Sequence, residues 1–368
     1  MTRISVTVGA VLIEEARRGI LLDASAAPNS AGPCRDGESL GDTPRPFHVR
    51  TEGKAIIVSV LVQMTVVVVF LCSLAGFIAH VHRYFELTSH FKLQYLLLAF
   101  ACLLVFITLH AWWSAICAFV TVCMNLAVVV PWYLPQPQVP LNQPYSPVKL
   151  LFANVESANR NFADFIGLVR EENPDVVIIQ EATERWIDHL HVIEEQFPYA
   201  KALPRPRSVG IALYSRIPVE RFDVVALGSE RRPGLVARLH LGGGVLSVVT
   251  VHPRPPLRPR YFRQRNEQLR DAASVVQALP LPKILVGDLN TSLWSPDYAQ
   301  VIRQTGLYNA RQGFGLAPTW PAFMPWPLLM IPIDHCLVSP DIRVLTMKTG
   351  RNIGSDHLPL IVDLVIPR

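Results

Sequence analysis

The sequence is poor in charge: only 17% of its 368 residues are Asp, Glu, Lys or Arg, against roughly 25% in an average soluble protein. The deficit is local, since residues 1–148 contain 9 basic and 8 acidic residues, whereas residues 149–368 contain 25 and 21. This distribution excludes a uniformly soluble protein, a disordered chain and a simple polytopic membrane protein. The length favours about two domains, and the C-terminal part is long enough to bury a full core.

Cysteine is also scarce in the C-terminal part, where a disulfide framework would need several. Of the six cysteines, four lie in apolar runs, where they behave as small hydrophobic residues, and only Cys336 lies in the C-terminal part. A disulfide framework is therefore excluded for that part. A domain with a single cysteine functions in oxidising and reducing compartments alike, so cysteine usage does not locate the protein.

Two stretches lack charge altogether, residues 55–79 and residues 93–148. About 20 apolar residues span a bilayer core, so the first stretch predicts one transmembrane helix. The second, up to residue 130, is too long for one span and suits two, with a break at the sequence HAWWS and with Trp112 and Trp113 at the interface. We expect three transmembrane helices in residues 55–131, at about 55–79, 93–110 and 112–131.

The remaining segments follow from composition. Residues 1–54 are rich in Ser, Ala, Gly and Pro with balanced charges, and they predict a disordered tail. Residues 132–147 are rich in proline, which disfavours helix and sheet and indicates an extended tether. Residues 148–368 form the soluble domain.

Orientation is predicted from the basic residues of the short loops. Arg35, Arg45, Arg50 and Lys54 lie shortly before the first predicted helix, Arg83 and Lys92 lie between the first and second, and the tether has none. The positive-inside rule then places the N-terminus in the cytoplasm and the C-terminal domain outside, in a multi-pass protein of the cell membrane.

The C-terminal part alternates strand-like and helix-like patterns, which indicates an α/β fold rich in strands. Apolar residues recur at helical spacing in residues 162–169 and 261–278. Strands are expected at residues 149–155, 174–180, 211–215, 235–241, 245–252, 283–286, 331–338, 343–348 and 359–365.

Polar side chains gather at the ends of these predicted strands, where a rigid sheet can aim several of them at one point. Taken singly, such a strand end is more often a solvated end or a helix cap. In chain order they are Asn154-Val-Glu156, Gln180-Glu181, His252, Gly-Asp288-Leu-Asn290, Ile-Asp334-His335 and Gly-Ser-Asp356-His357.

In this order and spacing, the motifs, above all GDLN and SDHLP, resemble those of the endonuclease/exonuclease/phosphatase superfamily. The resemblance covers about residues 148–368. It implies a four-layer αββα sandwich of the DNase-like type, preceded here by the three transmembrane helices, with the site at one edge of the sandwich. It also implies a metal-dependent hydrolase in which water attacks a phosphorus ester in one step, with Mg²⁺ or Mn²⁺ as cofactor.

The resemblance assigns roles residue by residue. Glu181 matches the main metal ligand, a hard oxygen donor of the kind Mg²⁺ prefers, and the other metal-side residues are Asn154, Glu156 and Asp356. Glu156 stands where many relatives have Asp, so its reach differs. The catalytic set comprises Asp288 and Asn290, which orient the water, His357 on the phosphate, Asp334 behind that imidazole, and His252 beside the leaving oxygen.

Two further segments concern the substrate. Six arginines lie between positions 254 and 270, and they either face water or, as predicted for Arg254, bind phosphate oxygens. Residues 312–333 carry no charge and run directly into Asp334. They form either a packed loop or an apolar lip at the bilayer, where Trp320 and Trp326 contact lipid.

Three spans, a proline-rich tether and this catalytic domain also resemble the membrane-anchored bacterial members of the superfamily linked to glycopeptide (teicoplanin) resistance. That resemblance implies a polyprenyl or other lipid pyrophosphate as substrate and the bilayer as partner. The alternatives are a membrane-bound nuclease that cleaves DNA or RNA, and a catalytically silent membrane scaffold. The sequence leaves the oligomeric state open.

Overall fold

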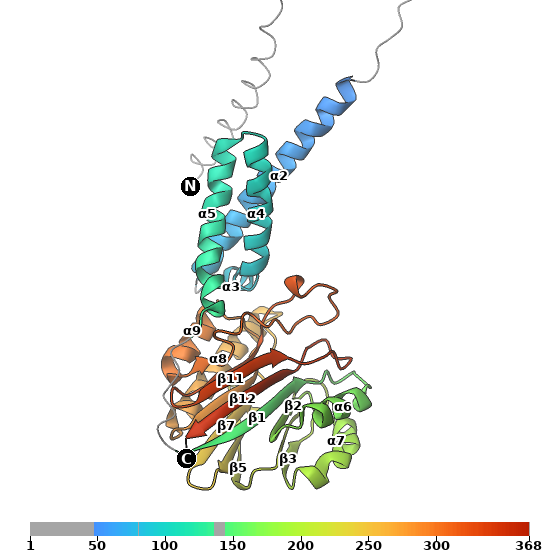
Figure 1. Ribbon diagram of the computed structural model, residues 1–368, viewed down its shortest axis with the longest axis vertical. Coiled ribbons are helices and arrows are strands. Elements are labelled where there is room, and N and C mark those ends of the chain that lie inside the picture. Colours follow the sequence, from blue (N-terminus) through green and yellow to red (C-terminus); the bar gives the residue numbers. More distant parts are fainter. Residues whose placement is uncertain (1–47, 80, 136–143, 368) are drawn as a thin grey trace, which may run out of the picture. The chain divides into compact units, whose positions relative to one another are not determined.

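The computed structural model describes residues 48–79, 81–135 and 144–367. The predicted disordered tail, residues 1–54, lies outside the described residues as far as position 47, whereas residues 48–54 are helical. The chain divides into two units, Met1–Ala55 and Ile56–Arg368, and apart from residues 48–55 the described residues belong to the second. Its elements are drawn in Figure 1.

The apolar region contains a long helix and a helical hairpin rather than three equal spans. Its helices are α2 (His48–Phe77), α3 (Arg83–Ser89), α4 (Lys92–Thr108) and α5 (Trp112–Val129), and a 3-10 helix η1 (Val130–Tyr133) follows. Two segments are long and apolar enough to cross a membrane, Ile57–Phe77 and Trp112–Tyr133. The third prediction, residues 93–110, coincides with α4, which meets this test only together with α3, at a bend of 69°. The described residues therefore give two candidate spans, or three if this bent pair is one.

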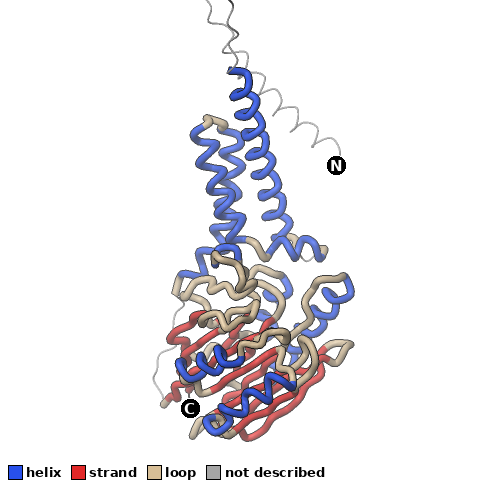
Figure 2. Tube along the Cα trace, turned by 90° about the vertical axis from the view of Figure 1, so that its right-hand side faces the viewer, coloured by secondary structure: helices blue, strands red, loops and turns tan. Residues whose placement is uncertain are grey.

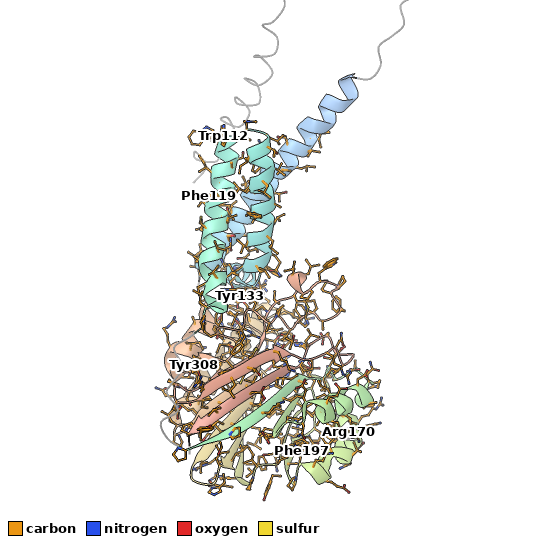
Figure 3. All side chains as sticks on the ribbon, in the orientation of Figure 1. Trp112, Phe119, Tyr133, Arg170, Phe197 and Tyr308 are labelled. Atoms are coloured by element: carbon orange, nitrogen blue, oxygen red, sulfur yellow. The ribbon has the colours of Figure 1, made fainter. Side chains whose placement is uncertain are left out.

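These helices pack through small and apolar side chains, with Phe106 of α4 and Ala118 of α5 fully buried between them. Other side chains point outward. Figure 3 shows Trp112, Phe119 and Tyr133 spaced from one end of the α5 segment to the other, and each is more than half exposed. Aromatic residues at both ends of an apolar helix are typical of the two membrane interfaces.

The C-terminal part contains two six-stranded sheets. The first has the order β11-β12-β1-β2-β4-β3 and the second β5-β6-β7-β8-β10-β9. The strands of the first sheet are β1 (Tyr145–Asn154), β2 (Val176–Gln180), β3 (Tyr199–Leu203), β4 (Ile211–Ser215), β11 (Arg343–Thr349) and β12 (Leu360–Pro367). Those of the second are β5 (Val219–Leu227), β6 (Arg232–His240), β7 (Val245–Val251), β8 (Lys283–Asp288), β9 (Tyr308–Asn309) and β10 (Asp334–Val338).

The two sheets face each other and each is covered by helices on its outer side (Figures 1 and 2). In β1, Leu150 and Phe152 enter the core between the sheets, whereas Leu151 and Ala153 enter the core beneath the helices. Successive side chains of a strand point to opposite faces, so a strand buried on both faces is apolar throughout. This arrangement confirms the α/β prediction with two packed sheets.

The helices of the domain are amphipathic or short. The first sheet is covered by α6 (Phe162–Glu172), α7 (Glu184–Leu190) and the 3-10 helix η2 (His191–Gln196), and the second by α8 (Pro259–Ala278) and α9 (Pro296–Thr305). A further 3-10 helix, η3 (Pro327–Leu329), lies in the uncharged segment before β10. Local signals set their ends: the Ser295 hydroxyl caps α9, and Gly306 ends it with a φ of +69°.

The predicted tether is more structured at its ends than the sequence indicates. Pro131 lies at the start of η1, where a missing N–H costs nothing, and β1 already begins at Tyr145 and includes Pro147. The middle of the tether, residues 136–143, lies outside the described residues. The Trp132 carbonyl accepts hydrogen bonds from the amides of Gly313 and Gly315, so the end of the apolar helix is attached to the catalytic domain.

Candidate active site

The topology brings the predicted strand ends to one edge. Each sheet contains one parallel pair, β1 with β2 and β7 with β8, and the carboxyl ends of parallel strands meet at the same edge. Asn154 and Asp288 end β1 and β8, while Glu181 and His252 directly follow β2 and β7. Because β10 runs antiparallel to β8, its first residue, Asp334, is paired with Asp288.

A buried histidine–aspartate pair forms one side of the site. His357 Nδ1 lies 2.8 Å from Asp334 Oδ2, and Nε2 of the same ring lies 3.8 Å from Asp288 Oδ2. Burial alone would lower the pKa of His357, but the carboxylates of Asp334, Asp288 and Asp356 together raise it to about 10. The imidazole is therefore held in one orientation, and its protonated form is strongly stabilised.

Asp288 is the hub of the polar network. Its Oδ2 lies 3.4 Å from His252 Nε2 and accepts hydrogen bonds from the side-chain amides of Asn154, at 3.3 Å, and Asn290, at 3.2 Å. The Asp288 amide donates to Gln180 Oε1 at 2.9 Å. A carboxylate fixed between two imidazoles and two amides is suited to accept or orient a proton of a reacting water.

Three further carboxylates, those of Glu156, Glu181 and Asp356, lie close enough to influence one another. The Asp356 amide donates to Glu156 Oε2 at 3.0 Å, and the Ser157 amide donates to Glu181 Oε2 at 3.0 Å. Burial raises the pKa of Glu156, and the negative charges of Asp356 and Glu181 raise it further. Carboxylates that destabilise one another in this way are stabilised by a bound cation, so the donor set fits a metal ion.

A second group of donors is more deeply buried. Among the described residues, ligand atoms of Asp288, Asp334 and His357 lie within 4.8 Å of one another. Asp334 Oδ1 is buried without a hydrogen-bond partner, and an Asp on one nitrogen of a ligating His is a common supporting arrangement. The site thus contains oxygen donors around Glu181, and a mixed nitrogen–oxygen group around Asp288 that binds a cation only when the His357 imidazole is deprotonated.

Three of the site residues have unusual backbone conformations. Glu156, Glu181 and Asn290 have φ values of 55°, 62° and 49°, in the left-handed region that residues other than glycine seldom adopt. Such conformations persist only where surrounding contacts fix them, and they are concentrated at functional sites. Here they turn the chain sharply just beyond the ends of β1, β2 and β8.

A cavity of about 460 Å³ opens over these groups, within the size range of small-molecule sites. Its polar side comprises Glu181, His252, Asp288, Asn290, Asp356 and His357. Its other side is mostly apolar and comprises Leu87, His90, Phe91, Pro255, Pro256, Leu257, Trp320, Ile331 and Ile333. The first three of these come from α3 and the turn before α4, so the apolar region supplies part of the wall.

The three predicted substrate-binding residues have different positions. Trp320 lines the cavity, and its Nε1 donates to Asp356 Oδ2 at 3.1 Å. Trp326 lies away from the cavity lining and is 65% exposed, next to exposed Leu328 and Leu329. Arg254 does not line the cavity, and its Nε lies 2.8 Å from Glu230 Oε2.

The sequence interpretation missed several residues that support the site. Arg232 is buried, and it donates from Nε to the His252 carbonyl and from Nη2 to the Ser208 carbonyl. Burial lowers the pKa of Arg232 to about 10. Ser355 Oγ bonds the Asn154 carbonyl at 2.7 Å. Ser355 could have been found from its place in the SDHLP motif, whereas no local signal distinguishes Arg232 from surface arginines.

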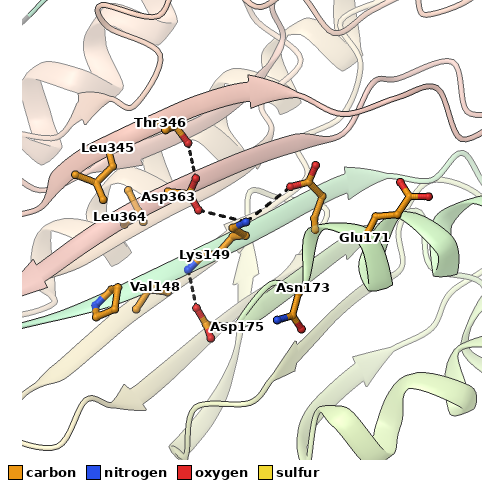
Figure 4. Close-up of a pocket in the computed structure, with 11 residues that line it drawn as sticks. Val148, Lys149, Glu171, Asn173, Asp175, Leu345, Thr346, Asp363 and Leu364 are labelled. Atoms are coloured by element: carbon orange, nitrogen blue, oxygen red, sulfur yellow. Dashed lines mark hydrogen bonds and ion pairs between the residues drawn. The ribbon is translucent and has the colours of Figure 1, made fainter.

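A second hollow, of about 620 Å³, lies near the opposite end of β1 (Figure 4). Its central cation is Lys149, whose Nζ lies 3.8 Å from a Glu172 carboxylate oxygen and 3.7 Å from one of Asp363. The Lys149 amide donates to Asp175. With its cation paired to two acids, this hollow is not suited to a phosphate.

Comparisons with known proteins agree with this geometry. The profile of the Endonuclease/Exonuclease/phosphatase family matches residues 151–357. Among solved structures, TDP2 of D. rerio complexed with a single-strand DNA product is 17% identical, with a TM-score of 0.51 over 60% of this chain and 99% of that one.

Two other solved structures are similar to the chain. An endonuclease/exonuclease/phosphatase from Beutenbergia cavernae DSM 12333 is 21% identical, with a TM-score of 0.49 over 60% of this chain and 72% of that one. Sphingomyelinase C from Streptomyces griseocarneus is 17% identical, with a TM-score of 0.44 over 59% and 99%. A comparison with curated proteins gave no match. At these identities the structural likeness concerns the fold.

Proposed function

Since this chain belongs to the Endonuclease/Exonuclease/phosphatase family, a family of metal-dependent phosphoesterases and nucleases, we propose that it hydrolyses a phosphate ester or pyrophosphate attached to a lipid. In this proposal the protein is anchored in the cell membrane by its apolar helices, and the catalytic domain functions at the outer face. A polyprenyl pyrophosphate is the specific substrate proposed. The resemblance to the membrane-anchored members linked to glycopeptide resistance motivates that choice.

The observation that carries the proposal is the two-sided cavity. Carboxylates and imidazoles on one side suit a metal-bound phosphate, and the apolar wall opposite suits the hydrocarbon next to it. The volume of about 460 Å³ accommodates a headgroup and the first part of a chain, not a whole polyprenyl lipid. Exposed Phe323, Trp326, Leu328 and Leu329 provide an apolar surface for the remainder.

The side chains have distinct roles in this reaction. Asp288, with Asn290 beside it, orients the attacking water and receives its proton. The protonated His357, held by Asp334, donates to a phosphate oxygen and balances its charge. His252, on the other side of Asp288, is placed to protonate the leaving oxygen.

A divalent cation, Mg²⁺ or Mn²⁺ in our proposal, would supply Lewis-acid polarisation of the phosphate and neutralise charge in the transition state. Glu181, Glu156, Asp356 and the side-chain amide oxygen of Asn154 are the groups that would hold it, since hard oxygen donors suit these ions. The mutual repulsion that raises the pKa of Glu156 favours this assignment.

The experiment compares three substrates with the purified full-length protein in detergent and Mg²⁺ or Mn²⁺: a polyprenyl pyrophosphate, a short soluble phosphate ester and plasmid DNA. We expect the lipid to have the highest kcat/KM and EDTA to abolish turnover. DNA as the preferred substrate would replace the proposal with the nuclease alternative, which the likeness to a DNA-complexed TDP2 raises. Arg254→Ala sharpens this outcome, because a nuclease that uses Arg254 on phosphates would lose affinity and salt sensitivity.

Orientation is tested separately. Val224 on β5 is 53% exposed, and a cysteine placed there should react with an impermeant thiol reagent on intact cells. The parent chain is the control, since Cys336, in the same domain, is buried. Labelling of Val224→Cys only after lysis would place the catalytic domain inside the cell.

A further inference from the structure

A buried ion pair joins the apolar region to the catalytic domain. Glu86 of α3 and Arg265 of α8 are both 0% exposed, and their Oε1 and Nη1 atoms are 3.2 Å apart. Arg265 Nη2 also lies 3.1 Å from Asp297 Oδ2 at the start of α9. Two charges removed from water need such partners, because a buried charge without one is strongly destabilising.

Arg265, Glu86 and His90 bond three consecutive residues shortly after the end of β8. Arg265 Nη1 donates to the Asn290 carbonyl at 2.9 Å. The Thr291 hydroxyl donates to Glu86 Oε1 at 3.3 Å. The Ser292 hydroxyl lies 2.8 Å from Nδ1 of His90, which follows α3. Thr291 and Ser292 are therefore bonded by a segment that lies 205 and 202 residues earlier in the chain, and Asn290 is bonded by Arg265, which Glu86 of that segment contacts.

This segment needs to be held. Asn290 has a φ of 49°, a conformation that the surroundings must maintain. Its amide donates to Asp288 Oδ1 at 2.8 Å and its side chain to Asp288 Oδ2 at 3.2 Å. A rotation of the Asn290 backbone would thus displace both the amide group and the carboxylate that orient the water.

We propose that Glu86 is a positioning residue of the active site, acting through Arg265 and Thr291 on Asn290 and Asp288. The catalytic groups are then fully aligned only while α3 is seated on the catalytic domain. This inference rests on the proposed function only in assuming that the protein hydrolyses a phosphate ester. It applies equally to a soluble ester and to a lipid.

The central variant is Glu86→Gln, which keeps the size of the side chain and removes its charge. On a short soluble ester we expect kcat to fall by roughly 10- to 100-fold, the cost of a small misplacement of reacting groups, with KM little changed. Lys92→Met is the matched control, because Lys92 is also buried in this region but its Nζ bonds the Ser73 carbonyl and not the catalytic segment. It should retain the parent kcat.

A triple variant separates positioning from stability. Glu86→Met with Arg265→Met and Asp297→Asn removes all three charges of this network, a replacement that is often neutral or stabilising in proteins, and it also removes the donor to the Asn290 carbonyl. We expect a folded protein, by its unfolding temperature, with low kcat. Parent kcat in the folded triple variant would overturn the proposal. Thr291→Val, which keeps the shape, should show a smaller loss of kcat in the same direction.

Hydrogen exchange gives a readout that does not depend on turnover. The amides of residues 289–293 should exchange faster in Glu86→Gln than in the parent chain, while those of β2 and β7 stay unchanged. Unchanged exchange at 289–293 would contradict the proposal even if no substrate were hydrolysed. Conversely, a parent protein that hydrolyses the soluble ester but not the lipid would refute the lipid substrate and leave the Glu86 test intact.

Discussion

The apolar helices and the catalytic domain satisfy their buried polar groups in different ways. Within the helices, Lys92 Nζ donates to the Ser73 carbonyl and Asn125 donates to the Ser73 hydroxyl, so these groups pair among themselves. A hydrocarbon environment would offer them no other partner. In the catalytic domain, buried acids and imidazoles gather at one sheet edge and leave donors and acceptors facing a cavity. In the first region these polar groups bond partners within the helices, whereas in the second the polar groups also line a cavity.

Glu86 and His90 belong to the first region by sequence and to the second by contact. They bond Arg265, Thr291 and Ser292 of the catalytic domain. The functional boundary between the two regions therefore does not coincide with the change in composition near residue 148.

The largest effect should come from the hub of the catalytic edge. Asp288→Asn keeps the shape but removes the carboxylate that receives a proton in our proposal, so kcat should fall by roughly 10²- to 10⁴-fold, the usual range for a general base. The unfolding temperature should stay close to that of the parent chain. Comparable turnover in the Asn variant would mean that the buried acids of this edge are structural, like the polar groups of the helices.

Metal binding should be affected next. Glu181 is a metal ligand in our proposal, so Glu181→Gln removes a ligand charge without removing core volume. Even partners outside the ligand shell contribute roughly 10- to 100-fold to metal affinity in other proteins. We expect at least a roughly tenfold weaker affinity for Mg²⁺ or Mn²⁺ by titration calorimetry and the loss of most activity. His335→Asn is not a suitable control, because that ring bonds the Thr291 carbonyl. Glu172→Gln is the suitable control, because Glu172 lies in the second hollow, far from the site. Undiminished affinity in Glu181→Gln would place the metal on the Asp288 group instead.

A smaller effect should distinguish the two tryptophans of the uncharged segment. Trp326→Ser removes an exposed ring that contacts lipid in our proposal, so KM for a lipid pyrophosphate should rise severalfold while a soluble ester is unaffected. Trp320→Phe removes the hydrogen bond to Asp356 and should lower turnover of both substrates. Equal losses on both substrates for Trp326→Ser would show that this loop only stabilises the fold.

The smallest effect concerns stability at high pH. The pKa of His357 is raised from 6.5 to about 10, so its contribution to stability is complete below about pH 6.5 and is lost as the pH rises through about 10. With EDTA present, the unfolding temperature of the parent chain should therefore fall across this range. The unfolding temperature should fall less in Asp334→Asn, because this variant lacks the carboxylate nearest to His357. Burial lowers the pKa of His335 to about 3, so that residue does not titrate in the same window. Identical pH profiles of the unfolding temperature in the parent chain and in Asp334→Asn would refute the pairing of a protonated His357 with Asp334.

The elements with strong local patterns were predicted well. Residues 211–215 form β4 as predicted, and the helix predicted for 261–278 is α8, which begins two residues earlier. The strands β3 and β5 were missed because they are partly exposed and carry polar residues such as Lys201 and Asp223. The α9 helix was missed because it is short and follows a turn-like sequence.

The interpretation of the arginines shows where local reasoning fails. Arg265 was expected to face water or bind phosphate, yet it is completely buried against Glu86. Nothing near Arg265 in the sequence predicts this, because its partner lies 179 residues away. Arg254, expected at the substrate, is instead paired with Glu230.

The sequence by itself determined the apolar helices, the alternation of strands and helices, and the chemical types at the strand ends. These depend on hydropathy, backbone preference and side-chain chemistry, which are properties of neighbouring residues. Only the tertiary structure decided that Asp288 lies between His252 and His357, that Trp320 faces the cavity while Trp326 faces outward, and that Glu86 reaches the segment after β8. Those outcomes depend on strand order and on the burial of charge, and both are settled only when distant parts of the chain pack together.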